Sequence, residues 1–230
     1  MRALNWLMKL IGLIIGLFIM AQLWFLGHIV WWKYQPVHST AFMRAQESKL
    51  KQQDPQFELK HTFVSYERIS DNLKRAVVSA EDANFIDHEG VDWDAIERAW
   101  AKNQKRGKLV SGGSTITMQL AKNLFLSGER SFVRKGEELI ITWMLEAVLD
   151  KERILEIYLN SCEWGVGVFG AEAAAKHYFQ TSAARLSAAQ SAKLAAMLPN
   201  PRFYDKQRNN PYLLRRAAMI NRYMGSAETP

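Results

Sequence analysis

The stretch that decides the fold is Ala76-Val77-Val78-Ser79-Ala80-Glu81-Asp82-Ala83-Asn84-Phe85-Ile86-Asp87-His88-Glu89-Gly90-Val91-Asp92. Its pattern predicts a helix, with Ser70 as the N-cap, that runs into a turn at Gly90. One apolar face is predicted by residues at helical spacing, namely Leu73, Val77, Ala80 and Asn84. Glu81 lies at the edge of that face, where partial desolvation raises a carboxyl pKa and prepares a general acid or base. On this segment alone, an ordinary surface Glu-Asp pair is the alternative.

The N-terminal part of the chain predicts one membrane-spanning helix. Residues 10–32 contain no Asp, Glu, Lys or Arg, and roughly 20 apolar residues are enough to cross a bilayer core. Trp24, Trp31 and Trp32 lie toward its end, as in an interfacial aromatic belt. No small-residue cleavage site follows, so we expect an uncleaved anchor after a short tail of residues 1–9. A buried helix of a soluble protein is the alternative.

Composition limits the class of protein. The chain has 230 residues, 48% of them hydrophobic, a formal net charge of +7 and a single cysteine, Cys162. A disulfide framework is therefore excluded, and nucleic acid is disfavoured because the basic residues form no run interleaved with aromatics. Basic residues flank both ends of the anchor, so their count does not fix its orientation. The charge suits an anionic membrane surface or an anionic substrate.

The rest of the chain predicts a mainly α fold. Residues 33–60 are polar, contain two prolines, and are expected to form a stalk with one short helix before a globular domain at 61–230. Long alternating β-branched runs are missing from that domain. Helices are expected near 93–104, 115–126, 131–150, 151–160, 171–179, 187–198 and 212–224. The helix at 131–150 is apolar on almost every side in its second half, which predicts burial at the centre of the domain.

A glycine pair before a capped helix is the second informative stretch. In Gly112–Asn123 the glycines precede Ser114 and Thr115, which leaves backbone N–H groups open at a helix start and favours a bound phosphate. Thr115, Gln119 and Lys122 fall on one polar stripe of this helix. An ordinary, well-capped amphipathic helix is the alternative.

A third charged segment enters the predicted central helix. Arg134 and Glu138 are i, i+4 neighbours, with Lys135 beside them and Arg130 near in sequence. This grouping suggests a polyanion site that also holds a charged acid, or else a solvated helix start. Residues 165–170 match G-x-G-x-x-G, but no βαβ pattern surrounds them, so we expect a tight turn and close helix packing instead of a dinucleotide site. No metal-ligand spacing is found.

Five motifs stand in order along about residues 60–205. They are Ala80–Phe85 with His88, Gly90 and Asp92, then Gly112–Thr117 with Gln119, Lys122 and Asn123, then Arg134, Lys135 and Glu138, then Lys151, Ile154–Glu156 and Tyr158–Asn160, and finally Gly165, Gly170, Ala173, Ala174, Tyr178 and Phe179. In this order they resemble the peptidoglycan glycosyltransferases of glycosyltransferase family 51, in the lysozyme-like superfamily. Because the chain ends soon after the motifs, we expect a member without a transpeptidase domain.

The resemblance implies both a fold and an activity. The fold is a lysozyme-like helical head with a small membrane-associated jaw, expected near residues 100–133. The activity is polymerisation of lipid II into β-1,4-linked glycan strands, with release of undecaprenyl pyrophosphate. Glu81 would be the general base, and Glu138 would assist at the pyrophosphate. Donor phosphates or sugars would be bound by Ser114, Thr115, Gln119, Lys122, Asn123, Arg134, Lys135 and, more weakly, Arg130.

The resemblance also implies a place in the cell. We expect a single-pass protein of the bacterial inner membrane, with its catalytic domain in the periplasm and a role in cell-wall synthesis and cell shape. Its partners would be lipid II and the growing glycan chain; other cell-wall synthesis or division proteins are left open. No cofactor is required, and a divalent cation at the pyrophosphate is left open. Two other functions remain: a membrane-anchored, lysozyme-like enzyme that cleaves glycan, and a non-catalytic envelope scaffold.

Overall fold

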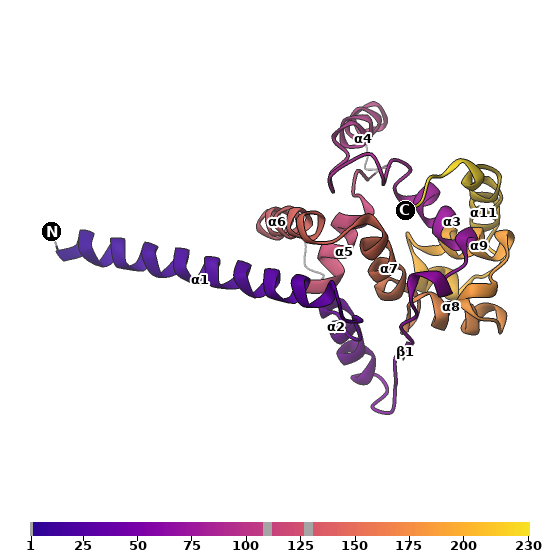
Figure 1. Ribbon diagram of the computed structural model, residues 1–230, viewed down its shortest axis with the longest axis horizontal. Helices are drawn as coiled ribbons and strands as arrows, with labels where there is room; N and C mark the ends of the chain where they lie inside the picture. The colour runs from indigo at the N-terminus through magenta and orange to yellow at the C-terminus, as the bar shows by residue number, and fades with distance from the viewer. Residues whose placement is uncertain (1, 108–111, 127–130) are drawn as a thin grey trace.

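The computed structural model describes residues 2–107, 112–126 and 131–230, and it confirms a mainly α protein (Figure 1). A long first helix, α1 (Arg2–Trp32), projects from a helical body. The body contains α2 (Ala41–Lys51), α3 (Asp71–Glu81), α4 (Trp93–Arg106), α5 (Ile116–Phe125), α6 (Phe132–Val148), α7 (Lys151–Ser161), α8 (Ala171–Phe179), α9 (Ala188–Met197), α10 (Pro201–Lys206) and α11 (Pro211–Tyr223). Short strands β1 (Lys60–His61), β2 (Glu163–Gly165) and β3 (Val168–Phe169) pair in the order β1-β3-β2, with β3 parallel to β1 and antiparallel to β2.

The helix that carries the opening motif ends earlier than predicted. Ser70 caps α3 as expected, but α3 stops at Glu81, and Asp82 has φ −162°, outside the helical region. The Asp82 carboxylate accepts hydrogen bonds from the Ile116 N–H at 2.9 Å and from His88 Nε2 at 2.9 Å. These two hydrogen bonds hold Asp82 in a conformation that does not continue the helix. The residues up to Gly90 form turns, so Asn84 does not extend the apolar face of α3.

The centre of the body is α7, where we had expected the apolar helix at 131–150. Every side chain from Ile154 to Ser161 is buried. In α6, only Glu138, Ile141, Thr142 and Leu145 are buried, and Trp143 is 51% exposed. The difference arises because α6 packs one face on α5 and α7, while its other apolar positions lie beside α1 or at the surface. The prediction of a fully buried α6 is therefore wrong.

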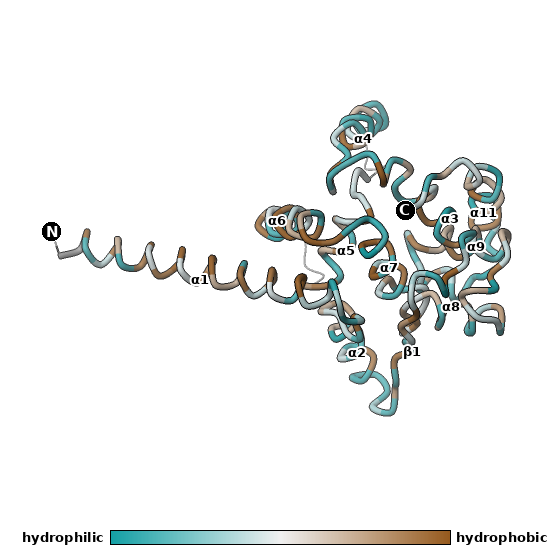
Figure 2. The backbone as a smooth tube through the Cα atoms, in the orientation of Figure 1, coloured by the Kyte–Doolittle hydropathy of each residue, from teal (hydrophilic) through white to brown (hydrophobic). Residues whose placement is uncertain are grey.

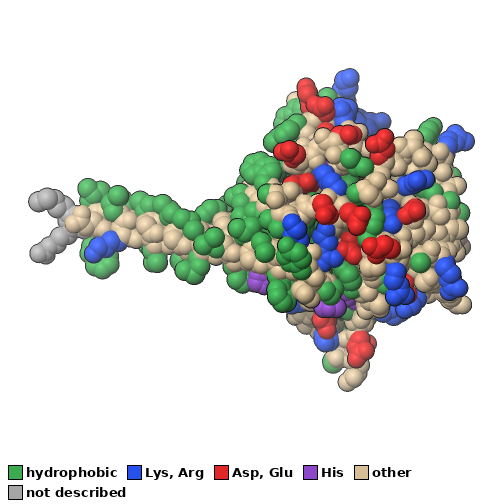
Figure 3. Space-filling model, viewed as in Figure 1, with side chains coloured by type: hydrophobic (Ala, Val, Ile, Leu, Met, Phe, Trp, Pro, Cys, Tyr) green, Lys and Arg blue, Asp and Glu red, His purple; other side chains and the backbone are tan. Residues whose placement is uncertain are grey.

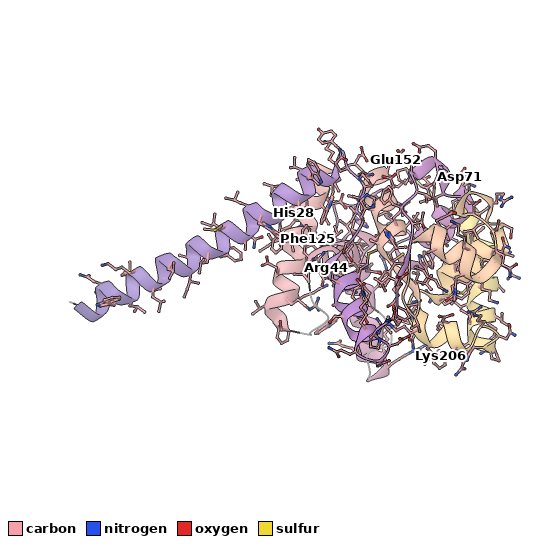
Figure 4. The ribbon with its side chains drawn as sticks, turned by 90° about the horizontal axis from the view of Figure 1, so that it is seen from below. His28, Arg44, Asp71, Phe125, Glu152 and Lys206 are labelled. Carbon is pink, nitrogen blue, oxygen red and sulfur yellow. The ribbon has the colours of Figure 1, made fainter. Side chains whose placement is uncertain are left out.

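The last turns of α1 pack against the body. The Phe125 ring at the end of α5 lies 4.9 Å from Phe25 and 5.2 Å from Trp32, between ring centroids. Figure 4 shows Phe125 facing His28 of α1. Gln22 Nε2 donates to Glu137 Oε1 of α6 at 2.6 Å. Helix α1 is thus packed against α5 and α6 of the body.

Most of α1 exposes apolar side chains, as Figure 3 shows. Figure 2 shows the hydropathy of the residues along this helix. Its segment Leu4–Trp32 contains an 18-residue window with a mean hydropathy of 2.3 and is long and apolar enough to cross a membrane. The segment 33–60, expected to be a stalk, contains α2, which packs on α5 and buries Met43. Residues 108–111 and 127–130 of the expected jaw lie outside the described residues.

The G-x-G-x-x-G segment forms a hairpin between β2 and β3. Gly167 at its turn has φ +67°, a conformation that favours glycine. A Cβ at Gly165 would lie 2.4 Å from the hydroxyl of Tyr178 in α8. Tight turning and close packing, the interpretation made from the sequence, are therefore confirmed.

Candidate active site

Two cavities adjoin the pair formed by Glu81 and Gln119. The first, about 240 Å³, lies between the end of α3 and residues 112–115, and Glu81 lines it together with Ser114. The second, about 150 Å³, is lined by Gln119, Lys122 and Asn123 of α5 and by Tyr158 of α7. Gln119 Nε2 donates to Glu81 Oε2 at 3.0 Å, which connects the walls of the two cavities. The residues predicted from the first two motifs therefore line these two cavities, which are together called the cleft below.

Glu81 is a largely buried carboxylate, with 13% of its side chain exposed. Its second oxygen, Oε1, lies 3.4 Å from Nη2 of Arg216 in α11. Burial raises the pKa of Glu81, and the Gln119 hydrogen bond and the Arg216 charge oppose that rise. The raised pKa agrees with the expectation from its place at the edge of the apolar face. Such a carboxylate is suited to accept a proton from a hydroxyl.

Gln119 is fixed from its other side by α7. Tyr158 donates its hydroxyl to Gln119 Oε1 at 3.0 Å, which orients the amide so that its NH₂ group points at Glu81. Burial raises the pKa of Tyr158 well above its usual value, so the hydroxyl stays protonated and remains a donor. The chain of hydrogen bonds from α7 through α5 to α3 holds Glu81 in a defined position.

Glu138 forms an ion-pair cluster within one turn of α6. Its two oxygens accept hydrogen bonds from Arg134 Nη1 at 2.9 Å and from Lys135 Nζ at 2.5 Å, and only 5% of its side chain is exposed. The adjacent Glu137 instead faces Gln22 of α1. The Arg-Lys-x-x-Glu spacing thus selects the carboxylate that lies with the two cations.

Lys122 lies close to both carboxylates. Burial and the charges of Arg134 and Lys135 lower the pKa of Lys122. The charges of Glu138 and Glu81 oppose this decrease. Within the described part of the chain, its ammonium makes no hydrogen bond or ion pair. Lys122 is therefore a cation free to bind an anionic ligand, at one side of the Arg134–Lys135 pair.

The start of α5 differs from the open, phosphate-binding terminus that was expected. Thr115, not Ser114, is the N-cap, and its hydroxyl accepts the Met118 N–H at 3.1 Å and donates to the Gly90 carbonyl at 2.6 Å. The carboxylate of Asp82 accepts the Ile116 N–H. Because protein groups already satisfy these amides, the terminus holds a carboxylate of its own chain. Ser114 is exposed and Thr115 is buried, so only Ser114 presents its side chain openly to the cleft.

The remaining predicted residues are placed as follows. Asn123 is 8% exposed and lines the second cavity. Arg130 lies outside the described residues. Among the residues described, no group of three or more His, Cys, Asp or Glu side chains is arranged to hold a metal ion.

Sequence reasoning missed Arg216, which contacts Glu81 from outside the five motifs. Its position carried a usable signal: Arg216 follows the buried Leu213 by three residues and precedes the buried Ile220 by four. A charged residue at the flank of the buried stripe is expected to reach toward the domain interior. The sequence predicts this helix near 212–224 but assigns none of its arginines to the site.

The site combines a desolvated carboxylate with a nearby set of cations. Glu81 is suited to remove a proton, while Lys122, Arg134 and Lys135 are suited to stabilise a departing anion. This arrangement on a helical body is typical of a transferase whose donor carries an anionic leaving group.

Comparison with known proteins agrees with that class, and the chain belongs to the transglycosylase family, whose model matches residues 46–225. A protein of Herminiimonas arsenicoxydans named biosynthetic peptidoglycan transglycosylase is 62% identical over 214 residues, which cover 93% of each chain. Proteins with the same name from Janthinobacterium sp. (strain Marseille) and Bordetella pertussis are 57% and 55% identical, and each alignment covers 100% of this chain and 98% of the relative.

Proposed function

We propose that this protein is a peptidoglycan glycosyltransferase that polymerises lipid II into β-1,4-linked glycan strands and releases undecaprenyl pyrophosphate. Family membership and the names of its relatives support the activity. The observation that carries the proposed mechanism is the buried Glu81 carboxylate together with Lys122, whose charge interacts both with Glu81 and with the cluster of Glu138, Arg134 and Lys135.

Glu81 acts as the general base in this mechanism. The 4-hydroxyl of the acceptor sugar transfers its proton to a Glu81 oxygen as the hydroxyl oxygen forms a bond to C1 of the donor. The bond from C1 to the pyrophosphate breaks on the opposite side, and the electron pair leaves with the phosphate oxygen. The configuration at C1 is therefore inverted, giving the β-linkage.

The cations at the other end of the cleft receive the leaving group. Lys122 has no partner among the described residues and contacts the pyrophosphate directly, while Arg134 and Lys135 add charge. Glu138 holds these two side chains in place and balances their charge when no substrate is bound. The remaining proposed substrate contacts are Ser114, Thr115, Gln119, Asn123 and Arg130.

The reaction as proposed needs no resident cofactor, and a divalent cation at the pyrophosphate is left open. Treatment with EDTA followed by addition of Mg²⁺ decides this point. Unchanged polymerisation after chelation means that the protein cations suffice, whereas loss and recovery assign a role to the metal ion.

We propose that α1 is the membrane anchor of an inner-membrane protein whose catalytic domain lies in the periplasm, where it meets lipid II and the growing glycan chain. The exposed apolar surface of α1 supports membrane insertion. Protease added to intact spheroplasts should digest the domain and leave a short anchor fragment. Protection of the full chain would contradict the orientation. Other cell-wall synthesis or division proteins are further candidate partners, tested by cross-linking in cells.

The activity is tested with the purified full-length chain in lipid vesicles. Incubation with lipid II should yield long glycan strands on a gel and undecaprenyl pyrophosphate by mass spectrometry. A parallel incubation with mature glycan separates the alternatives. Cleavage of glycan without polymerisation of lipid II would establish the lysozyme-like hydrolase, and inactivity toward both substrates would favour the scaffold.

A further inference from the structure

Arg216 reaches the catalytic carboxylate from a helix outside the five motifs. It lies on α11, which packs on α3 and α9 at the side of the body away from α1 (Figure 1). Its Nη2 is 3.4 Å from both Glu81 Oε1 and the carbonyl oxygen of Ala80, at the end of α3. Only 23% of the Arg216 side chain is exposed. The side chain therefore lies against the site instead of extending into solvent.

We infer that Arg216 is a positioning residue, which keeps Glu81 ionised and directs its Oε1 atom toward the cleft. The inference rests on the proposed function for its catalytic consequence. The two carboxylate oxygens have different partners: Oε2 accepts from the neutral amide of Gln119, and Oε1 faces the charged guanidinium of Arg216. The amide fixes orientation, and the guanidinium supplies the charge.

The groups around Glu81 show why this charge matters. Burial and the neighbouring Asp82, which directly follows α3, favour the protonated, neutral form of Glu81. From α5, Gln119 donates a hydrogen bond and Lys122 contributes at longer range, with its charge shared with Glu138. Tyr158 of α7 and Cys162, which directly follows α7, are neutral because burial raises the pKa of each. Across the described ranges, Arg216 is the cation that forms an ion pair with Glu81.

Removing the guanidinium charge should therefore raise the pKa of Glu81 further. A base must be ionised to accept a proton, so the acidic limb of the pH–rate profile should move to higher pH. The loss of activity is then largest at low pH and shrinks as the pH rises. A purely structural role for Arg216 predicts instead a loss that is the same at every pH.

The test compares Arg216→Gln, which keeps a hydrogen-bond donor without the charge, with Arg216→Lys, which keeps the charge. Arg216→Gln should shift the acidic limb of kcat/KM for lipid II polymerisation upward by about one pH unit, which is roughly a tenfold loss below the limb. Arg216→Lys should restore most of the wild-type profile. The control is Arg215→Gln, because Arg215 is exposed on the same helix and makes no ion pair within the described residues.

A second measurement does not depend on activity. The Glu81 carboxyl is titrated by ¹³C NMR in the full chain, with Glu81→Gln identifying its resonance. A higher Glu81 pKa in Arg216→Gln than in wild type supports the inference, and an unchanged pKa overturns it. If the wild-type chain does not polymerise lipid II, the proposed function fails while this titration still decides the role of Arg216. Arg216→Met replaces Arg216→Gln should the latter fail to fold.

Discussion

The site contains two buried glutamates, Glu138 and Glu81, and they differ in the charge and distance of their hydrogen-bond partners. Glu138 lies within one turn of Arg134 and Lys135, and each of its oxygens is taken by a cation at 2.9 Å or less. Glu81 receives one neutral amide at 3.0 Å and one guanidinium at 3.4 Å, and burial raises its pKa. Two short ion pairs thus hold Glu138 between cations, whereas Glu81 has more distant partners and a raised pKa.

The difference separates two tasks that carboxylates of one site perform. A general base must exchange a proton during the reaction, which requires a pKa near the working pH. A counter-ion must keep its charge so that neighbouring cations stay in place. Within this cleft, partner distance and partner charge, more than burial alone, distinguish the two, because both glutamate side chains are at most 13% exposed.

Replacement of the base should give the largest effect. Glu81→Gln removes the proton acceptor while preserving size, and we expect polymerisation of lipid II to fall at least about 100-fold. The measurement is the initial rate of glycan formation by the purified chain. Glu89→Gln, an exposed change in the same motif, is the control and should keep the wild-type rate. A near-normal rate for Glu81→Gln would remove Glu81 from the mechanism and end the contrast with Glu138.

Neutralising a cation near Glu138 should have the next largest effect. Lys135→Met removes a charge proposed to stabilise the leaving pyrophosphate, and we expect a loss of about 10- to 100-fold, concentrated in use of the donor. Donor and acceptor concentrations are varied separately, with an acceptor that cannot serve as a donor. The exposed Lys206→Met is the matched control. An equal effect on donor and acceptor use would contradict the division of tasks between the two ends.

The pH dependence of the wild-type chain should reflect Glu81. Because its pKa is raised from 4.5, the rate should fall with decreasing pH along a limb that lies above pH 4.5. The sign for stability is opposite: a carboxyl whose pKa is raised by folding adds stability below pH 4.5 and loses that contribution as the pH rises through the raised pKa. Chemical unfolding at pH 8 should therefore find Glu81→Gln at least as stable as wild type. A clearly less stable variant would mean that Glu81 is a structural carboxylate like Glu138.

The smallest effect on chemistry is expected at Asp82, next to the base. Its carboxylate accepts hydrogen bonds from His88 and from the Ile116 N–H. Asp82→Ala leaves these two donors without a partner and should lower the free energy of unfolding by roughly 1–3 kcal/mol. Urea unfolding measures this loss, with the exposed Asp87→Ala as control. At temperatures where the variant is folded, it should retain most of its activity. A loss as large as that of Glu81→Gln would assign the proton transfer to both acids.

The sequence predicted features that depend on local spacing. Most of the helices, the Ser70 cap and the i, i+4 pair of Arg134 and Glu138 follow from periodicity and short-range geometry, and the structure contains them. The short helix α10 was not predicted. The early end of α3 could not be predicted, because it depends on the Asp82 carboxylate reaching an amide 34 residues away. Arg216 carries a local signal beside the buried stripe of its helix, but its partner, Glu81, is 135 residues away and could not be identified from that signal. Tertiary contacts of this kind leave little trace in local patterns.

The α5 helix start shows a different limit. The glycine pair and the Ser-Thr cap were recognised, but their pattern does not reveal whether solvent, a ligand or a distant carboxylate occupies the terminus. Asp82 occupies it, so the negative charge that a helix N-terminus favours is supplied by the chain itself. The charge that could bind an anion at the site then comes chiefly from Lys122, Arg134 and Lys135.

The packing of α1 on Phe125 and Glu137 fixes the orientation of this helix relative to the body. The helix is continuous from Arg2 to Trp32, and its last turns are fixed to α5 and α6. With α1 in the bilayer, as proposed, a continuous helix connects the membrane to the cleft. One residue inserted before the turns that pack on α5 and α6 would rotate the membrane-embedded part by about 100° and shift it by about 1.5 Å relative to the cleft. Helix α1 thereby sets the distance of the site from the membrane and its orientation toward a lipid-linked substrate.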